Sequence, residues 1–416
     1  MNKWVRNFII FIIILVFISA FSSSYSSLNI DNLTYVLAIG IDKSDDNKLE
    51  VSFHFSNPIP AESSASEKVS PIINTVTASS LSNAINLVNG YQGRQLNLSH
   101  CKVIIFSEKI ASEGISDEIY TLINDTQIRP SANIIVSKCN AKYYMQQIKP
   151  EIENLLSRYY EIFAESSKYV GHIPNATIGV FFNNLICKTC EPYAILGGIN
   201  KDNSKTNSST SSDFGDNNNI NSQKDYNIKA NDSSVEGENK VENIGVAVFK
   251  DDKLVGELNA LETMAFLSIR NKVDRFLVSV PDPLNDNQYL DIYITPHGST
   301  SVSVNTSTSS PYIKLSCNFT AQIYSMSENS KYLSADVLES ISNSCNTYLE
   351  AMFLDYLYKS SKDFEADING LGIFAAKNFT NTHEFEEYDW ETSYKDAFFD
   401  VNIETSVKSG MLINET

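Results

Sequence analysis

The first apolar stretch of the chain runs from Phe8 to Phe21, after Lys3 and Arg6 and before a group of serines. A positively charged start, an apolar centre and small residues behind it are typical of an export signal. The run is short for a membrane span, which needs about 20 apolar residues, and Ala20-Phe21-Ser22 offers a cleavage site. We therefore predict export, with residues 1–27 acting as a cleaved signal or a retained membrane anchor.

Beyond this segment, strand patterns alternate with helical ones. A short apolar run, 35–41, and an alternating run, 49–55, flank the polar turn that begins at Asp42, which predicts a β-hairpin. The expected strands are 35–41, 49–55, 102–106 and 133–136, and the expected helices are 79–89, two within 107–124, 141–148 and 151–165. This order predicts an N-terminal α+β region over residues 28–198, of one or two subdomains.

A strongly polar stretch follows. Only six of the forty residues from Lys201 to Lys240 are apolar, and Asn, Ser, Asp and Lys dominate. Such a segment buries too little apolar surface to offset the entropy of ordering. We predict a disordered linker over residues 199–241, which would span roughly 35 Å as a flexible coil and would let the two halves of the chain move independently.

The C-terminal half, residues 242–416, opens with another hairpin pattern. Strands are expected at 244–249, 254–256, 275–280, 290–295, 300–304, 312–323 and 398–407, and helices at 259–269 and 334–362. The long helix carries one apolar stripe, made of Leu338, Ile341, Cys345, Leu349, Met352 and Tyr356. These elements predict an α+β domain whose sheet, mixed or antiparallel, is covered by helices.

Composition narrows the class of partner. At 416 residues and 42% hydrophobic content, the chain is long enough for two or three folded domains. Its formal charge of −18 argues against nucleic-acid binding, which depends on a basic surface. The same charge argues against attachment to anionic lipid through basic patches, so a hydrophobic segment would have to hold the protein at a membrane.

The six cysteines give a weak signal. Only Cys187 and Cys190 lie close together, and they could be unrelated thiols, a local disulfide, or a redox or metal element. We favour unrelated thiols. A four-ligand zinc site would need a second pair at similar spacing, and the sequence has none.

No constellation of residues points to catalysis. The five histidines (His54, His100, His172, His297 and His383) are scattered, and the sequence lacks the nucleophile-elbow, zinc-protease and phosphate-loop motifs. The polar turn at Asp42 lacks the Gly and Glu of a calcium loop. Glu386, Glu387 and Asp389 are merely adjacent, which is no sign of an acid pair across a cleft. We predict no enzyme activity and no catalytic, cofactor-binding or metal-binding residues.

An ordered set of segments resembles the Ger(x)C family of spore germination proteins. The segments are Ala38-Ile-Gly-Ile-Asp42, Leu98-Ser-His-Cys-Lys-Val-Ile-Ile105, Glu108-Lys-Ile-Ala111, Gly114-Ile115, Ile128-Arg129-Pro130, Gly245-Val-Ala-Val-Phe-Lys250, Lys253-Leu-Val-Gly256, Glu262-Thr263, Ala366-Asp-Ile-Asn-Gly-Leu-Gly372, Trp390 and Gly410. They extend over nearly the whole chain after the apolar segment, in the order typical of that family.

The resemblance implies a three-domain α+β protein without catalytic activity or cofactor. It implies the C subunit of a nutrient germinant receptor at the outer face of the spore inner membrane, working with integral-membrane A and B subunits. An exported cell-surface binding or adhesion module unrelated to germination is the alternative.

The chain departs from the family pattern in two places. Family members usually carry a lipid-modified cysteine directly after the apolar segment, whereas Ser22 to Ser27 occupy that region here and the first cysteine is Cys101. Retention at a membrane would then depend on the uncleaved apolar segment or on partner subunits. The polar linker also looks longer than the family's connection.

Overall fold

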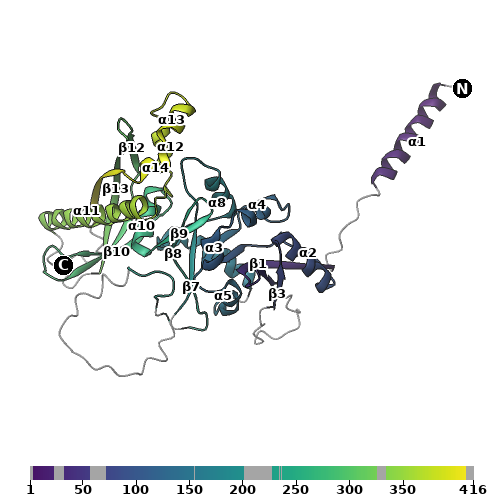
Figure 1. The fold of residues 1–416 in the computed structure, drawn as a ribbon, viewed down its shortest axis with the longest axis horizontal. Helices are drawn as coiled ribbons and strands as arrows, with labels where there is room; N and C mark the ends of the chain where they lie inside the picture. Colours follow the sequence, from purple (N-terminus) through teal and green to yellow (C-terminus); the bar gives the residue numbers. More distant parts are fainter. Residues whose placement is uncertain are drawn as a thin grey trace.

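The protein is described from a computed structural model (Figure 1), which covers residues 3–22, 32–56, 72–153, 155–200, 227–233, 235, 237–325 and 334–408. The strands are β1 (Leu33–Lys43), β2 (Leu49–Phe55), β3 (Ile72–Ala78), β4 (Gln95–Asn97), β5 (Val103–Ser107), β6 (Asn133–Ser137), β7 (Tyr193–Ile199), β8 (Val241–Lys250), β9 (Lys253–Leu258), β10 (Phe276–Pro281), β11 (Tyr289–Pro296), β12 (Ser301–Asn305), β13 (Tyr312–Ser325) and β14 (Phe398–Lys408). The helices are α1 (Lys3–Ser22), α2 (Leu81–Gln92), α3 (Glu108–Glu113), α4 (Ser116–Asn124), α5 (Ala141–Gln147), α6 (Leu156–Glu165), α7 (Ser167–Val170), α8 (Ile178–Leu185), α10 (Ala260–Ile269), α11 (Ala335–Tyr358) with the π-helical turn η4 (Lys359–Asp363), α12 (Gly372–Ala376), α13 (Thr382–Tyr388) and α14 (Trp390–Tyr394). The α+β class is as predicted, whereas β3, β7, α8 and the short helices α12 to α14 were missed.

The first sheet is built around a parallel centre. Its strand order is β3-β2-β1-β5-β6-β7-β8-β9, with β4 beside β1. Strands β1, β5, β6 and β7 run parallel to one another, and the remaining long strands add antiparallel at the two sides. The central strands are apolar on both faces because helices cover both sides of the sheet.

The two faces of this sheet carry different helices. Ile104 and Phe106 of β5 belong to the apolar core that contains α2, α3, α4 and α8. Val103 and Ile105 of the same strand belong to the core that contains α5. This alternation follows from the two-residue period of a strand, and it places α3 and α5 on opposite faces.

The second sheet is mixed. Its order is β10-β11-β13-β12, with β14 beside β13. Strands β13 and β14 pair in parallel along the full length of β14, which is possible because the long connection through α11 crosses back over the sheet. Helix α11 lies along this sheet (Figure 1). The predicted stripe is confirmed, since Ile341, Cys345, Leu349, Met352 and Tyr356 are buried and Leu338 is partly buried against the same core.

Helix α10 joins the two sheets through one core. Its buried residues face every side, because it packs on β8 and β9 and also on α11. A capping box starts the helix: the Asn259 side chain accepts the Glu262 N–H at 2.9 Å, and the Glu262 carboxylate accepts the Asn259 N–H at 2.8 Å. Apolar residues of both sheets and of α10 form a single continuous cluster, so the two halves fold against each other.

The connection between β7 and β8 differs from the prediction in its last third. Residues 201–226 lie outside the described part of the chain, so their disorder stays a prediction. Residues 227–233 and 237–240, in contrast, pack along the first sheet. Ala230 is fully buried and donates its N–H to Ile244 at 3.0 Å, and the Lys229 ammonium pairs with Glu257 at 2.7 Å. The prediction of a disordered linker is therefore wrong for these residues, because backbone and side-chain partners on the sheet order them.

The two flanks of this connection are paired with each other. The Asn200 N–H donates to the Lys240 carbonyl at 2.7 Å, and β7 pairs antiparallel with β8. The prediction that the insertion lets the halves move independently is therefore wrong, because both of its ends lie on one sheet. The domain boundaries at residues 198 and 242 stay a prediction, and the hairpin β8–β9 that follows the second boundary pairs with the first sheet.

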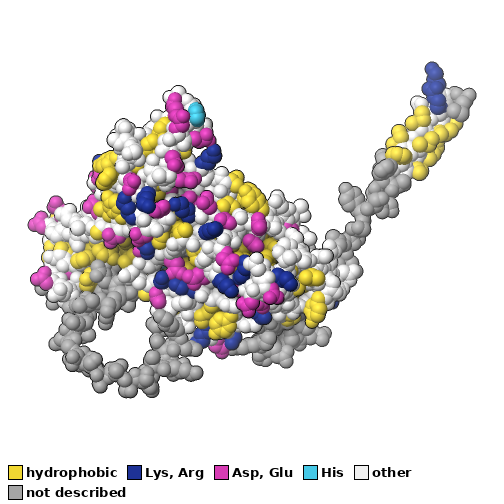
Figure 2. Space-filling model, in the orientation of Figure 1, with side chains coloured by type: hydrophobic (Ala, Val, Ile, Leu, Met, Phe, Trp, Pro, Cys, Tyr) yellow, Lys and Arg dark blue, Asp and Glu magenta, His cyan; other side chains and the backbone are white. Residues whose placement is uncertain are grey.

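Helix α1 exposes its apolar side chains from Trp4 to Phe17 (Figure 2). Trp4 is 84% and Phe17 is 64% exposed. Among the described residues, no helix combines the length and apolarity required for a membrane span. The role of residues 1–27 as signal or anchor stays a prediction.

Candidate functional site

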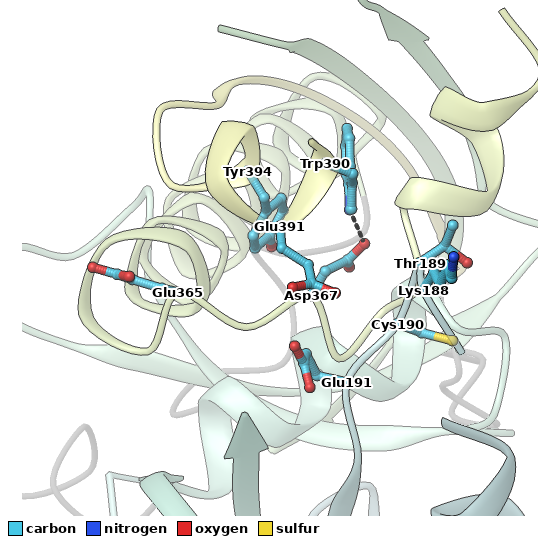
Figure 3. A pocket seen from close by; sticks show the side chains of 9 residues that line it. All are labelled: Lys188, Thr189, Cys190, Glu191, Glu365, Asp367, Trp390, Glu391 and Tyr394. Carbon is cyan, nitrogen blue, oxygen red and sulfur yellow. Dashed lines mark hydrogen bonds between the residues drawn. The ribbon is translucent and has the colours of Figure 1, made fainter. Parts of the chain in front are cut away.

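The candidate site is a small pocket where the loop before β7 meets the loop after η4 (Figure 3). The first loop belongs to the first sheet and the second loop leads to the helices beside the second sheet, so the pocket lies between the two halves. It has about 10 Å³ of space for a water-sized molecule. Its lining is Lys188, Thr189, Cys190, Glu191, Glu365, Asp367, Trp390, Glu391 and Tyr394.

Glu191 enters the pocket from the first sheet and is 8% exposed. Its backbone N–H donates to the Asp367 carbonyl at 3.0 Å, which joins the two loops directly. Its carboxylate accepts the Asp251 N–H at 2.7 Å. Burial raises the pKa of Glu191 to about 7, because removing water from the charged carboxylate outweighs this hydrogen bond.

Asp367 enters from the opposite side and is 3% exposed. One carboxylate oxygen, Oδ2, accepts the Gly372 N–H at 2.8 Å and the Trp390 indole N–H at 3.1 Å. The other oxygen, Oδ1, is buried without a protein partner. Burial raises the pKa of Asp367 to about 6, although these hydrogen bonds favour the charged form.

Close packing fixes the second loop. A Cβ placed on Gly372 would lie 2.6 Å from the Trp390 indole nitrogen and 2.9 Å from the Thr189 carbonyl oxygen. Gly370 has a φ of 71°, in the left-handed region that favours glycine. The Arg270 guanidinium donates to the Ile368 carbonyl at 2.6 Å. The loop 366–372 is thus held by backbone contacts that admit no larger side chain at residue 372.

Ion pairs and a disulfide surround the pocket. Glu365 pairs with Lys250 at 3.2 Å and also with Lys395, and Lys188 pairs with Glu386 at 2.5 Å. A disulfide joins Cys187 to Cys190 directly before Glu191. Our interpretation of this pair as unrelated thiols is therefore wrong, and the local disulfide is the alternative that the fold realises.

The pocket has room for one water molecule beside the carboxyl groups of Glu191 and Asp367. A cavity of this size admits a single water, and Asp367 Oδ1 is a free acceptor for it. The described residues contain no cluster of three or more His, Cys, Asp or Glu side chains placed to hold a metal ion. The site therefore brings two buried acids with raised pKa values together at the contact between the two halves.

The candidate residues named from the sequence lie outside this pocket, and their contacts are with neighbouring side chains or helix ends. His54 is buried on β2 with Nδ1 3.1 Å from the Tyr160 hydroxyl, and burial lowers its pKa to about 4. His383 and Glu387 face each other on α13 at 3.5 Å, and Asp389 caps α14. The sequence search missed Glu191 and Asp367 as a site, although Asp367 and Trp390 are part of the resemblance.

Comparison with known proteins gives two matches to family models. Residues 26–196 match the spore germination protein N-terminal domain, and residues 244–410 match the spore germination B3/GerAC-like C-terminal domain. The chain belongs to the Ger(x)C family of spore germination proteins. Among solved structures, one described as the crystal structure of the GerBC protein matches with a TM-score of 0.48 and 14% identity, over 89% of this chain and 96% of that chain. Comparison with curated proteins gives no match.

Membership of the Ger(x)C family supports the role of a germinant receptor C subunit. The two matched regions are also the two that meet at the pocket, since Glu191 lies in the first and Asp367 in the second. The pocket is thus one place where the two matched regions contact each other in this chain.

Proposed function

We propose that this protein is the non-catalytic C subunit of a spore germinant receptor and takes part in nutrient-triggered germination. The observation that carries the proposal is the ordered match of both Ger(x)C regions, residues 26–196 and 244–410. In this proposal the protein works with the integral-membrane A and B subunits of the receptor.

We further propose that the protein acts at the outer face of the spore inner membrane and reaches it through its N-terminal segment. The exposed apolar side chains of α1 support this, since an apolar surface in water is unfavourable and a lipid or protein environment would cover it. A body with a formal charge of −18 gains little from anionic lipid. Attachment would therefore depend on α1 or on the partner subunits.

The test is to delete the gene, score germination with each nutrient class, and probe the spore inner-membrane fraction for the protein. We expect loss of the response to one nutrient class, rescue by the complementing gene, and recovery of the protein with that membrane. Co-purification of the A and B subunits with a tagged copy would identify the complex.

Two results would overturn the proposal. One is normal germination with every nutrient. The other is recovery of the protein from the culture medium, which would favour a secreted cell-surface binding module. A copy in which a cleaved export signal replaces residues 3–22 separates the modes of attachment, because it stays in the membrane fraction only if the partner subunits retain it.

A further inference from the structure

A second cavity lies far from the pocket between the halves, at the carboxyl ends of β5 and β6. It is a cleft of about 360 Å³ lined by Ser107, Glu108, Lys109, Ser112, Lys138, Cys139 and Asn140. Its volume falls in the range of cavities that bind small molecules, roughly 300–1,000 Å³.

The topology of the first sheet explains why the cleft is there. Strands β5 and β6 are adjacent and parallel. The chain leaves β5 into α3, which packs on one face, and leaves β6 into α5, which packs on the other. Two connections that separate to opposite faces leave a crevice at the carboxyl edge, and this is where open α/β sheets bind their ligands.

A buried acid fixes the walls of the cleft. Asp42, at the end of the neighbouring strand β1, is 2% exposed. Its carboxylate accepts the N–H groups of Ala141 at 2.7 Å and Lys142 at 3.1 Å, and it also accepts a hydrogen bond from the Ser107 side chain. One side chain thus ties the start of both connections to β1. The cleft is therefore a preformed feature of the sheet edge.

The charges along the cleft favour an anion. Lys109 and Lys138 are lysines of the two connections and Glu108 is the acid among the lining residues. The Lys138 ammonium lies 2.8 Å from Glu257 Oε2, and the same oxygen lies 2.7 Å from the Lys229 ammonium. The Asp232 carboxylate also acts on Lys229, so the observation that favours an anion is the lining itself, which has two lysines and one acid.

The neutral polar groups add a second requirement. The Ser107 hydroxyl is bonded to Asp42, and the Ser112 hydroxyl donates to the Glu108 carbonyl at 2.8 Å. Their oxygens therefore remain as acceptors, together with the Glu108 carboxylate. Lys109, Lys138 and the Asn140 amide supply donors. A matching ligand carries an anionic group at one end and hydroxyl or amine donors at the other.

We propose that the cleft between the carboxyl ends of β5 and β6 binds a small organic anion, a carboxylate or a phosphate, that also carries hydrogen-bond donors. Lys109 and Lys138 bind the anionic group, and Glu108 and Ser112 accept from its donors. This site is separate from the pocket between the halves, and it does not depend on the receptor role.

The test uses the full chain in mild detergent and two probes, glycerol 3-phosphate and L-malate, with sodium chloride at matched ionic strength as reference. Binding is followed by calorimetric titration and by the rise of the unfolding temperature. We expect saturable binding of at least one probe. The probe that binds identifies the anion as phosphate or carboxylate.

Charge variants locate the site. Lys109→Gln and Lys138→Gln should each weaken binding by about tenfold or more, whereas Lys188→Gln, an equal charge change near the other pocket, should leave it unchanged. Lys109 is exposed and its replacement is not expected to disturb folding, which keeps the test valid if Lys138→Gln destabilises the chain. The proposal is overturned if neither probe binds at about 10 mM, or if all three variants bind equally well.

Discussion

Glu191 and Asp367 are two buried acids that meet across the contact between the halves, and their environments differ. Asp367 accepts two hydrogen bonds on one oxygen and leaves the other bare. Glu191 accepts one backbone N–H while Asp251 and Glu391 lie near enough to raise its pKa further after burial. Because the pKa of Glu191 is raised to about 7, the charge of its carboxyl group changes with pH near neutrality.

Replacement of Glu191 should change how stability depends on pH. The folded-state pKa of about 7 lies above the ordinary value of 4.5, so the native state holds a proton that the unfolded chain releases between these pH values. Stability therefore falls as pH rises from about 4.5 to about 7. Glu191→Gln should remove a fall on the order of 2–3 kcal/mol, measured by urea unfolding at stepped pH.

The matched control for this prediction is Glu386→Gln. Lys188 holds the pKa of the exposed Glu386 carboxyl below its usual value. Ionisation of Glu386 therefore raises stability as the pH rises, and Glu386→Gln cannot remove the fall in stability that Glu191 causes. Equal pH profiles for Glu191→Gln and the natural chain would contradict the assignment of this slope to Glu191.

Gly372 should tolerate no side chain. An added Cβ would meet the Trp390 indole nitrogen at 2.6 Å and the backbone of Thr189 at 2.9 Å, and neither can move far in a packed contact. We expect Gly372→Ala to destabilise the chain by about 1–3 kcal/mol, with a shift in the fluorescence of Trp390. The control Gly90→Ala has open space around it within α2 and should be neutral or stabilising by up to about 1 kcal/mol.

At the scale of elements, α11 is both the cover of the second sheet and the cap of one of its edges. The Glu350 carboxylate accepts the Ile403 N–H of β14 at 3.1 Å, and the Ser342 hydroxyl donates to the Thr405 carbonyl. On β12, the Asn378 amide donates to the Val304 carbonyl at 2.6 Å. Side chains of neighbouring elements thus satisfy edge groups that would otherwise be free to pair with another chain.

Truncation of the buried face of α11 should be costly. Leu349 is completely buried between the helix and the second sheet, and Leu349→Ala would leave a cavity there. We expect a loss of about 2–5 kcal/mol in the free energy of unfolding, measured by urea titration. Leu87→Ala on α2, where the side chain is 47% exposed, should change it by at most about 0.5 kcal/mol. Similar losses for both variants would show that α11 is not the principal cover of this sheet.

At the scale of the whole molecule, the two matched regions form one packed body. The apolar cluster extends from the first sheet through α10 to the second sheet, and the Lys188 ammonium of the first region pairs with Glu386 of the second region at 2.5 Å. The two halves should therefore unfold together, and a substitution at their contact should change the stability of both.

The long connection should be dispensable for this cooperation. The parts of the chain on its two sides are joined, since Asn231 Oδ1 accepts the Ile199 N–H at 2.6 Å. Replacing residues 201–226 with six Gly and Ser residues should therefore leave a single unfolding transition. A shorter loop has a smaller closure cost, and we expect a gain of about 1 kcal/mol or no change. Urea unfolding and size-exclusion chromatography test this, and two separate transitions would contradict it.

Local patterns in the sequence determined much of the fold. The apolar run of β1, the two-residue period of β2 and the polar turn between them predicted the hairpin. The stripe from Leu338 to Tyr356 predicted the buried face of α11. The order of short motifs along the chain also pointed to the Ger(x)C family before any contact was known. These features can be predicted from the sequence because each depends on residues that lie within a few helical turns or one hairpin of each other.

Only the tertiary structure decided the site and the joining of the halves. Glu191 and Asp367 are single acids far apart in the chain, and their pKa values rise because packing from both halves removes water. The Cys187–Cys190 disulfide depended on the turn that brings the two sulfurs together. Residues 227–233 and 237–240 look polar enough for disorder, yet the first sheet orders them through hydrogen bonds. Desolvation, strand pairing and long-range contact are properties of the folded chain, and no local pattern encodes them.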